Sequence, residues 1–136
     1  MFAAETINWL AVIVATVVHM VLGFLWYGPV FGNIWMAGMG KTREEMGSST
    51  QSIVISGVSA LVMAIALACL LTLPAPNTVN LAGGALVGAV AGIGFVATTA
   101  ATGAAFEGKN RTVLLLGIGY QVVGLIIMGA ILGAWR

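Results

Sequence analysis

The chain has 136 residues, of which 60% are hydrophobic and 7% are charged, and its formal net charge is +1. This composition lies far from that of soluble globular proteins, and the near-neutral charge excludes a basic surface for nucleic acid. The single cysteine, Cys69, cannot form an intramolecular disulfide, and no histidine is spaced to share a metal ion with it. We therefore expect no metal, no cofactor and no nucleic-acid partner.

Four apolar runs fill most of the chain, and none of them contains Asp, Glu, Lys or Arg. A bilayer core of ~30 Å needs about 20 helical residues, so each run is long enough to cross it. The runs cover residues 7–28, 52–73, 80–103 and 112–135. The sequence predicts an all-α integral membrane protein, a single domain over residues 1–136 with four transmembrane helices in contact with lipid.

Aromatic residues mark the ends of the first and last runs. Trp and Tyr prefer the boundary between lipid headgroups and acyl chains, and Pro29 cannot continue the helical hydrogen bonding. The residues expected at this boundary are Trp9, Trp26, Tyr27, Trp35 and Trp135.

The loop between the first two runs is the only long one. Phe31, Ile34 and Trp35 follow helical spacing, which predicts a short amphipathic helix lying in the membrane interface. Thr42 and Glu45 fit a capping box, so the second helix is expected to begin near Thr42; the alternative is a solvated turn.

Small residues recur every four positions in three of the runs, which favours close helix contact in a membrane. They are Ser56, Ala60, Ala64 and Ala68 in the second run, Gly84, Gly88 and Gly92 in the third, and Gly129 and Gly133 in the fourth. The pattern leaves open whether the contacts lie within one chain or between copies.

The distribution of basic residues predicts the orientation of the chain. Lys41, Arg43, Lys109 and Arg111 belong to the first and third loops, which share one side, whereas the other side has only Arg136. Positively charged loops stay cytoplasmic, so we expect both termini outside.

His19, Tyr120 and Gln121 are the polar residues of most interest within the runs. His19 and Gln121 each lie ~13 Å from the loop ends of their runs, and ionisable groups at such depth are costly and often functional. A hydrogen bond from His19 to Gln121 or Tyr120 would be purely structural, which we prefer, and the alternative is a proton or solute path.

Thr98 and Thr102 share one face of the third run and are candidates for the same polar cluster. More often such threonines donate to the carbonyl group four residues earlier in their own helix, and we prefer that interpretation.

Several segments resemble a small bacterial membrane family. They are residues 8–12 (NWLAV), 25–29 (LWYGP), 94–99 (GFVATT), 106–109 (FEGK) and 128–135 (MGAILGAW). The family is known only as domain of unknown function family 1761, and the resemblance covers nearly the whole chain. It implies four spans in a bacterial cytoplasmic membrane, without implying a reaction, ligand or partner. After Thr99 the chain is less polar than the Asn-containing stretch associated with the family.

The functional hypotheses follow from what the apolar runs contain. They show no nucleophile–base pair, no metal-ligand spacing and no paired carboxylates, so we do not expect an enzyme. We predict a scaffold or accessory subunit that acts through contacts with copies of itself or with a larger membrane complex. The alternative is a small channel or transporter with a narrow polar path near His19, Tyr120 and Gln121.

Overall fold

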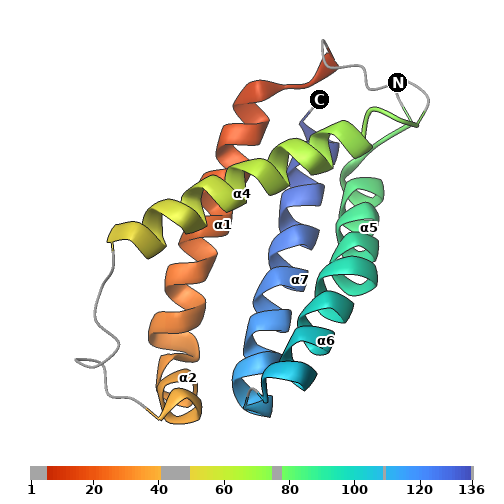
Figure 1. Cartoon of the computed structure of the whole chain (residues 1–136). Helices are drawn as coiled ribbons and strands as arrows, with labels where there is room; N and C mark the ends of the chain where they lie inside the picture. The colour runs from red at the N-terminus through yellow and green to blue at the C-terminus, as the bar shows by residue number, and fades with distance from the viewer. Residues whose placement is uncertain (1–5, 41–49, 75–77, 109, 136) are drawn as a thin grey trace.

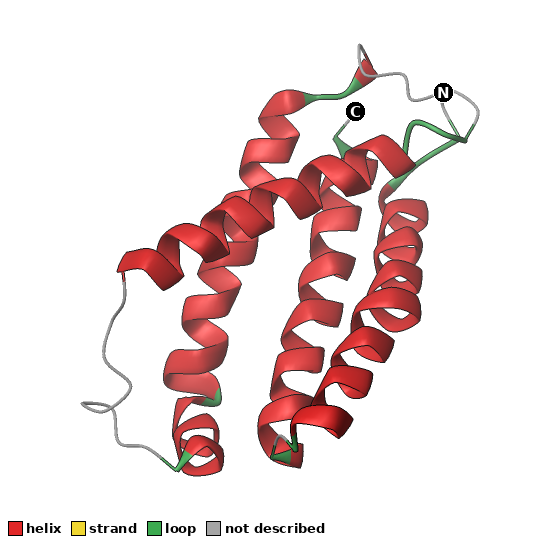
Figure 2. Cartoon of the chain, in the orientation of Figure 1, coloured by secondary structure: helices red, strands yellow, loops and turns green. Residues whose placement is uncertain are grey.

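The computed structural model describes residues 6–40, 50–74, 78–108 and 110–135, and the regular structure of these residues is entirely helical (Figure 2). In chain order the elements are α1 (Trp9–Leu25), η2 (Trp26–Val30), α2 (Gly32–Met39), α4 (Thr50–Leu70), α5 (Leu81–Ala91), η3 (Gly92–Ala97), α6 (Thr98–Glu107) and α7 (Arg111–Ala134).

Among the described residues, four helical segments are long and apolar enough to cross a membrane, which confirms the predicted fold class. They are Trp9–Val30, Thr50–Leu70, Leu81–Glu107 and Arg111–Ala134. The largest difference from the predicted bounds is in the third span, which continues to Glu107 instead of ending at residue 103. The capping box at Thr42 and Glu45 lies outside the described residues.

Asparagine side chains cap the N-termini of three of the four spans. Asn80 accepts a hydrogen bond from the backbone N–H of Gly83 at 2.8 Å, and Asn110 accepts one from Thr112 at 2.8 Å. Asn8 caps α1 in the same way. Each cap satisfies backbone donors that have no partner inside the helix, which explains where these spans begin.

The first span ends in a π-helical turn, Trp26–Val30, and the predicted break before Pro29 lies inside this turn. The break lies at Gly28, whose φ of −108° and ψ of −106° are not helical. A residue before proline is pushed away from the helical conformation, which explains why the bend precedes Pro29. Beyond the bend, α2 is the short helix predicted between the first two spans, and it lies beside the start of α7 (Figure 1).

Helix α4 crosses obliquely over α1 and α7 (Figure 1). Ala60, Ala64 and Ala68 of the predicted stripe are buried in this contact, together with Leu67. Ser56 of the same stripe is exposed and takes no part in the packing within the chain, so a contact with another chain stays a prediction for it. The reason is the crossing angle, which carries the first half of α4 away from the bundle.

Helices α5 and α7 make the most extensive contact in the bundle. Gly84 and Gly129 face each other so closely that a Cβ atom on either would overlap the other's carbonyl oxygen. A Cβ on Gly88 would overlap the carbonyl oxygen of Leu125, and one on Gly133 would overlap that of Asn80. The glycine stripes of the third and fourth spans therefore meet each other within one chain.

Gly92, the last member of the glycine stripe, also faces α7. A Cβ on Gly92 would lie 3.1 Å from the Cα atom of Val122, so the contact is looser here than at Gly84 and Gly88. Gly92 also begins η3, after which α6 continues the span.

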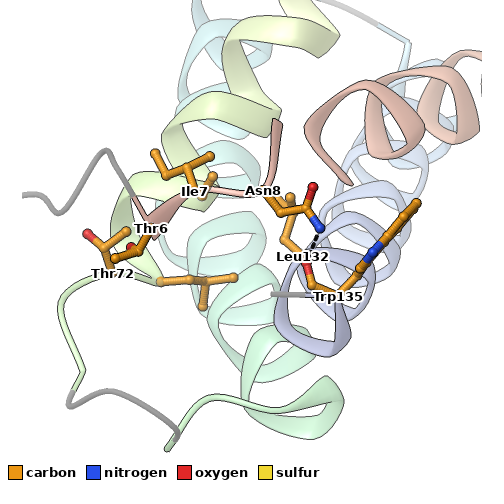
Figure 3. A pocket seen from close by; sticks show the side chains of 8 residues that line it. Thr6, Ile7, Asn8, Thr72, Leu132 and Trp135 are labelled. Atoms are coloured by element: carbon orange, nitrogen blue, oxygen red, sulfur yellow. Dashed lines mark hydrogen bonds between the residues drawn. The ribbon is translucent and has the colours of Figure 1, made fainter. Parts of the chain in front are cut away.

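The largest fully buried side chains of the core are Val12 of α1, Met128 of α7 and Leu71, just beyond the end of α4. These residues lie in the half of the bundle nearest the chain termini. There Asn8 Nδ2 donates to the backbone oxygen of Trp135 at 3.4 Å, beside a cavity of about 10 Å³ (Figure 3). Such a volume has room for one water molecule and is too small for a larger ligand. We therefore interpret this pocket as part of the packing between the first and last helices.

Candidate functional site

His19 of α1 is buried against α7, with 4% of its surface exposed. The Tyr120 hydroxyl lies 2.9 Å from His19 Nδ1 and donates to the His19 backbone oxygen at 3.0 Å. The two ring centroids are 4.8 Å apart, so the side chains also pack against each other. Of the two hydrogen-bonding partners proposed for His19, the structure selects Tyr120.

A neutral imidazole satisfies this geometry. When the hydroxyl donates to the backbone oxygen, its own oxygen accepts a hydrogen bond from Nδ1–H. When it donates to Nδ1 instead, the ring proton lies on Nε2. In both arrangements the contact needs no charge on His19.

Gln121 lies beside this pair without completing it. Its side chain interacts with His19, but Gln121 Oε1 and His19 Nε2 are both buried and neither has a partner with standard hydrogen-bond geometry. The two groups are thus neighbours in one cluster, and Tyr120 alone is bonded to the imidazole.

Two glycines make room for the two rings. A Cβ atom on Gly124 would lie 2.7 Å from His19 Cδ2, and one on Gly23 would lie 2.8 Å from the Tyr120 hydroxyl oxygen. His19 of α1 therefore rests on a glycine of α7, and Tyr120 of α7 rests on a glycine of α1. This reciprocal arrangement was not predicted, although a ring followed by glycine four residues later occurs in both helices.

Aromatic side chains continue the α1–α7 contact towards α2. Trp26 Nε1 donates to the backbone oxygen of Leu116 at 3.0 Å, and Tyr27 packs on Trp35 with 4.8 Å between ring centroids. Trp26, Tyr27 and Trp35 are half-buried in these contacts. Of the five aromatic residues predicted at the membrane boundary, these three also hold helices together.

The other two predicted boundary residues, Trp9 and Trp135, are exposed. They lie at the end of the bundle that carries the chain termini (Figure 1).

Thr98 and Thr102 are not part of the His19 cluster. Both are exposed, and their hydroxyl groups donate to the backbone oxygens of Gly94 at 2.8 Å and Thr98 at 2.9 Å. The preferred interpretation, hydrogen bonding within their own helix, is confirmed. Thr99, instead, lies closer to the cluster, because it lines the same groove as Gln121.

Two hollows adjoin Tyr120. One, of about 660 Å³, lies between α6 and α7; the other, of about 220 Å³, lies between α1 and the first half of α4. Tyr27 and Tyr120 line both, whereas His19 lines neither. The histidine is therefore enclosed by helix contacts, and the tyrosines and Gln121 are the cluster members that face open space.

Within the described ranges, no group of three His, Cys, Asp or Glu side chains is placed to hold a metal ion. Comparison with curated proteins and with solved structures finds no significant match. The sequence model of one family, described as a protein of unknown function (DUF1761), matches residues 10–133. Because that match spans most of the chain, the protein belongs to the DUF1761 family.

Proposed function

We propose that the protein is a non-catalytic scaffold or accessory subunit that binds another membrane helix along the first half of α4. The observation that carries this proposal is a stripe of serines on one face of α4, Ser52, Ser56 and Ser59, which is exposed in this chain and borders the hollow between α4 and α1. Hydroxyl groups on small side chains allow close approach and hydrogen bonding between helices in a bilayer. The partner is a second copy of this chain or a helix of a larger complex.

The position of α4 supports the same proposal. Nearly all residues from Thr50 to Ser59 are exposed, with Gly57 half-buried, whereas Ala60 and Ala64 further along are fully buried. The glycine stripes of α5 and α7 pack against each other, whereas the serine stripe of α4 remains exposed.

A polar path through the bundle is the second candidate function. It is favoured by the position of Tyr120 and Gln121 on the wall of the larger groove. Against it stands His19, the titratable residue such a path would use, which bonds to Tyr120 and lines neither hollow. The accessory role accounts for this arrangement more simply.

Disulfide cross-linking in native membranes tests the proposed contact. In a Cys69→Ala background, Ser59→Cys is expected to form an oxidised dimer, or an adduct with a larger partner, because the serine stripe faces a second helix. The measurement is the mass of the product on a non-reducing gel with and without oxidant.

Leu61→Cys is the matched control, because Leu61 is exposed on nearly the opposite face of α4. It should cross-link at least tenfold less than Ser59→Cys. Equal yields from the two positions would show random collision in the membrane and would refute a specific α4 interface.

We also propose that the protein lies in a bacterial cytoplasmic membrane with both termini outside. Gly38 in α2 lies near Val113 in α7. The C-terminal end of α2, which leads to Lys41, and the N-terminal end of α7, at Arg111, therefore lie at the same end of the bundle. Thr6 and Trp135, the first and last described residues, lie together at the opposite end of the bundle. Basic residues favour the cytoplasm, which assigns the end with the first and third loops to that side.

Reporter fusions after Arg136 test this orientation. We expect activity from alkaline phosphatase, which needs export, and no fluorescence from a fluorescent protein that folds only in the cytoplasm. The reverse pattern would overturn the orientation.

A further inference from the structure

The third span is not one continuous α-helix. The π-helical turn η3, Gly92–Ala97, separates α5 from α6 and includes Gly94, where an added Cβ atom would meet nothing within 4 Å. Before this turn, Gly84 and Gly88 pack against the backbone of α7. Beyond it, most residues of α6 are exposed, and the hollow of about 660 Å³, here called the α6–α7 groove, lies between the two helices. The packing of the span therefore changes at η3.

The π turn also changes which face of the span is directed at α7. Successive residues of an α-helix are about 100° apart, and a π turn holds about one residue more than an α-helical turn. The contact of Gly84, Gly88 and Gly92 with α7 would continue in an unbroken α-helix through Phe95, Thr99, Thr102 and Phe106. The residues of α6 that line the groove are instead Thr99, Ala100, Gly103, Ala104 and Glu107. Ala100, Gly103 and Glu107 each come one position after a residue of the unbroken series, which is the shift that one extra residue produces.

This shift leaves two aromatic side chains on the surface. Phe95 is 73% exposed and Phe106 is 90% exposed, and Thr102 is exposed as well. In the unbroken α-helix these three residues would face α7, where Leu114 and Ile118 form the apolar wall of the groove. Helices in a bilayer associate through close van der Waals packing, so placing the two rings in the groove would compensate for the loss of the π turn.

The hydrogen bonds around η3 are compatible with both forms. In the π turn the Thr98 hydroxyl donates to the backbone oxygens of Gly94 at 2.8 Å and Phe95 at 3.1 Å, a kind of bond that accompanies bent helices. In an unbroken α-helix the backbone N–H groups of Thr98 and Thr99 would donate to the same two oxygens. Each form therefore supplies these oxygens with donors, which a bilayer core without water requires.

We propose that η3 switches between this π turn and an α-helical turn, and that the switch rotates α6 by about 100° against α7. In the π form Ala100 and Gly103 line the groove, and in the α-helical form Thr102 and Phe106 face α7 and fill it. Gly108 ends α6 in the left-handed conformation, with a φ of 71°, and provides a flexible joint at the far end of the rotating segment. This device goes beyond the proposed accessory role, since it lies in the third span and uses no residue of the α4 stripe.

Cross-linking between α6 and α7 tests the switch in the full-length protein in native membranes. In a Cys69→Ala background, Leu114→Cys on α7 is combined with one cysteine on α6, and the pair is treated with a short bis-methanethiosulfonate reagent. Intact mass spectrometry separates the bridged chain from chains that reacted at each cysteine singly. We expect Gly103→Cys to be bridged in the π form and Thr102→Cys to be bridged in the α-helical form, so both pairs should give product.

Ala101→Cys is the matched control for Thr102→Cys. The two positions are exposed and equally distant from the groove in the π form, because one follows Ala100 and the other precedes Gly103. Only the rotation brings Thr102 towards α7, whereas Ala101 faces away from α7 in both forms. Bridging of Thr102→Cys no greater than that of Ala101→Cys would show one fixed orientation of α6 and would overturn the proposal.

Removing the Thr98 hydroxyl tests whether η3 is the switch. Thr98→Ala takes a donor from the π form alone, so the yield of Thr102→Cys relative to Gly103→Cys should rise about fivefold, the effect of one hydrogen bond of ordinary strength. Thr16→Ala is the control, since the Thr16 hydroxyl donates to the backbone oxygen of Val12 at 2.8 Å in α1, and it should leave the ratio unchanged. No rise in Thr98→Ala, or an equal rise in both variants, would refute the role of η3.

Discussion

Replacing Gly88 with leucine is expected to destabilise the folded protein by about 3 kcal/mol or more, the upper range for overpacked sites. The added Cβ would overlap the backbone oxygen of Leu125 and lie 3.0 Å from the Cα atom of Ile126. Backbone atoms of a helix cannot move aside as a side chain can, so α5 and α7 must separate. Thermal unfolding in detergent, followed by helical circular dichroism, measures the loss.

Gly94→Leu is the matched control, since Gly94 belongs to the same span and a Cβ there meets nothing within 4 Å. Leu86→Ala is a second control, because Leu86 is 65% exposed. Both should change the midpoint of unfolding far less than Gly88→Leu. An unchanged midpoint in Gly88→Leu would contradict the backbone-to-backbone contact of α5 and α7.

This contact also shows what the small-residue pattern reveals and what it leaves open. Glycine every fourth residue predicts a surface that another helix can approach closely, and Gly84 and Gly88 have that role. The pattern does not identify the partner. The same spacing in α4 packs Ala60 and Ala64 but leaves Ser56 exposed, because the crossing angle of α4 depends on contacts distant in sequence.

The spans themselves were predictable because the energetics of the bilayer act on each segment separately. An uncharged apolar run of sufficient length is expected to cross the membrane whatever its neighbours are. Exact bounds depend on local chemistry, and caps such as Asn80 and Asn110 settle them.

The contact of His19 with Tyr120 was predicted, whereas Thr98 and Thr102 were wrongly offered as members of the cluster and the register of α1 against α7 was only approximate. Depth measured from the ends of the runs placed His19 opposite Gln121, whereas the structure places it against Gly124, about one turn further along α7. The first helical segment extends to Val30 and the fourth begins at Arg111, so the depths counted from residues 28 and 112 were short by two residues and one residue. The repeated ring-to-glycine spacing in α1 and α7 was the signal that would have given the correct register.

Replacing His19 with glutamine is expected to leave the fold nearly unchanged, whereas alanine should cost about 2–4 kcal/mol. Glutamine can exchange a hydrogen bond with the Tyr120 hydroxyl and still fills part of the space over Gly124. Alanine removes both the bond and the ring contacts, and it leaves a void between α1 and α7. Unfolding midpoints of the two variants and the parent, measured in one detergent, provide the comparison.

The same substitutions separate the accessory role from a polar path. We expect no proton flux from the parent or from His19→Gln in liposomes, because His19 is enclosed and bonded to Tyr120 in a contact that needs no charge. Flux present in the parent and lost in His19→Gln, with the fold intact, would refute the accessory role and make His19 part of a conduction path. If His19→Ala were as stable as His19→Gln, the structural importance of the His19–Tyr120 contact would be refuted instead.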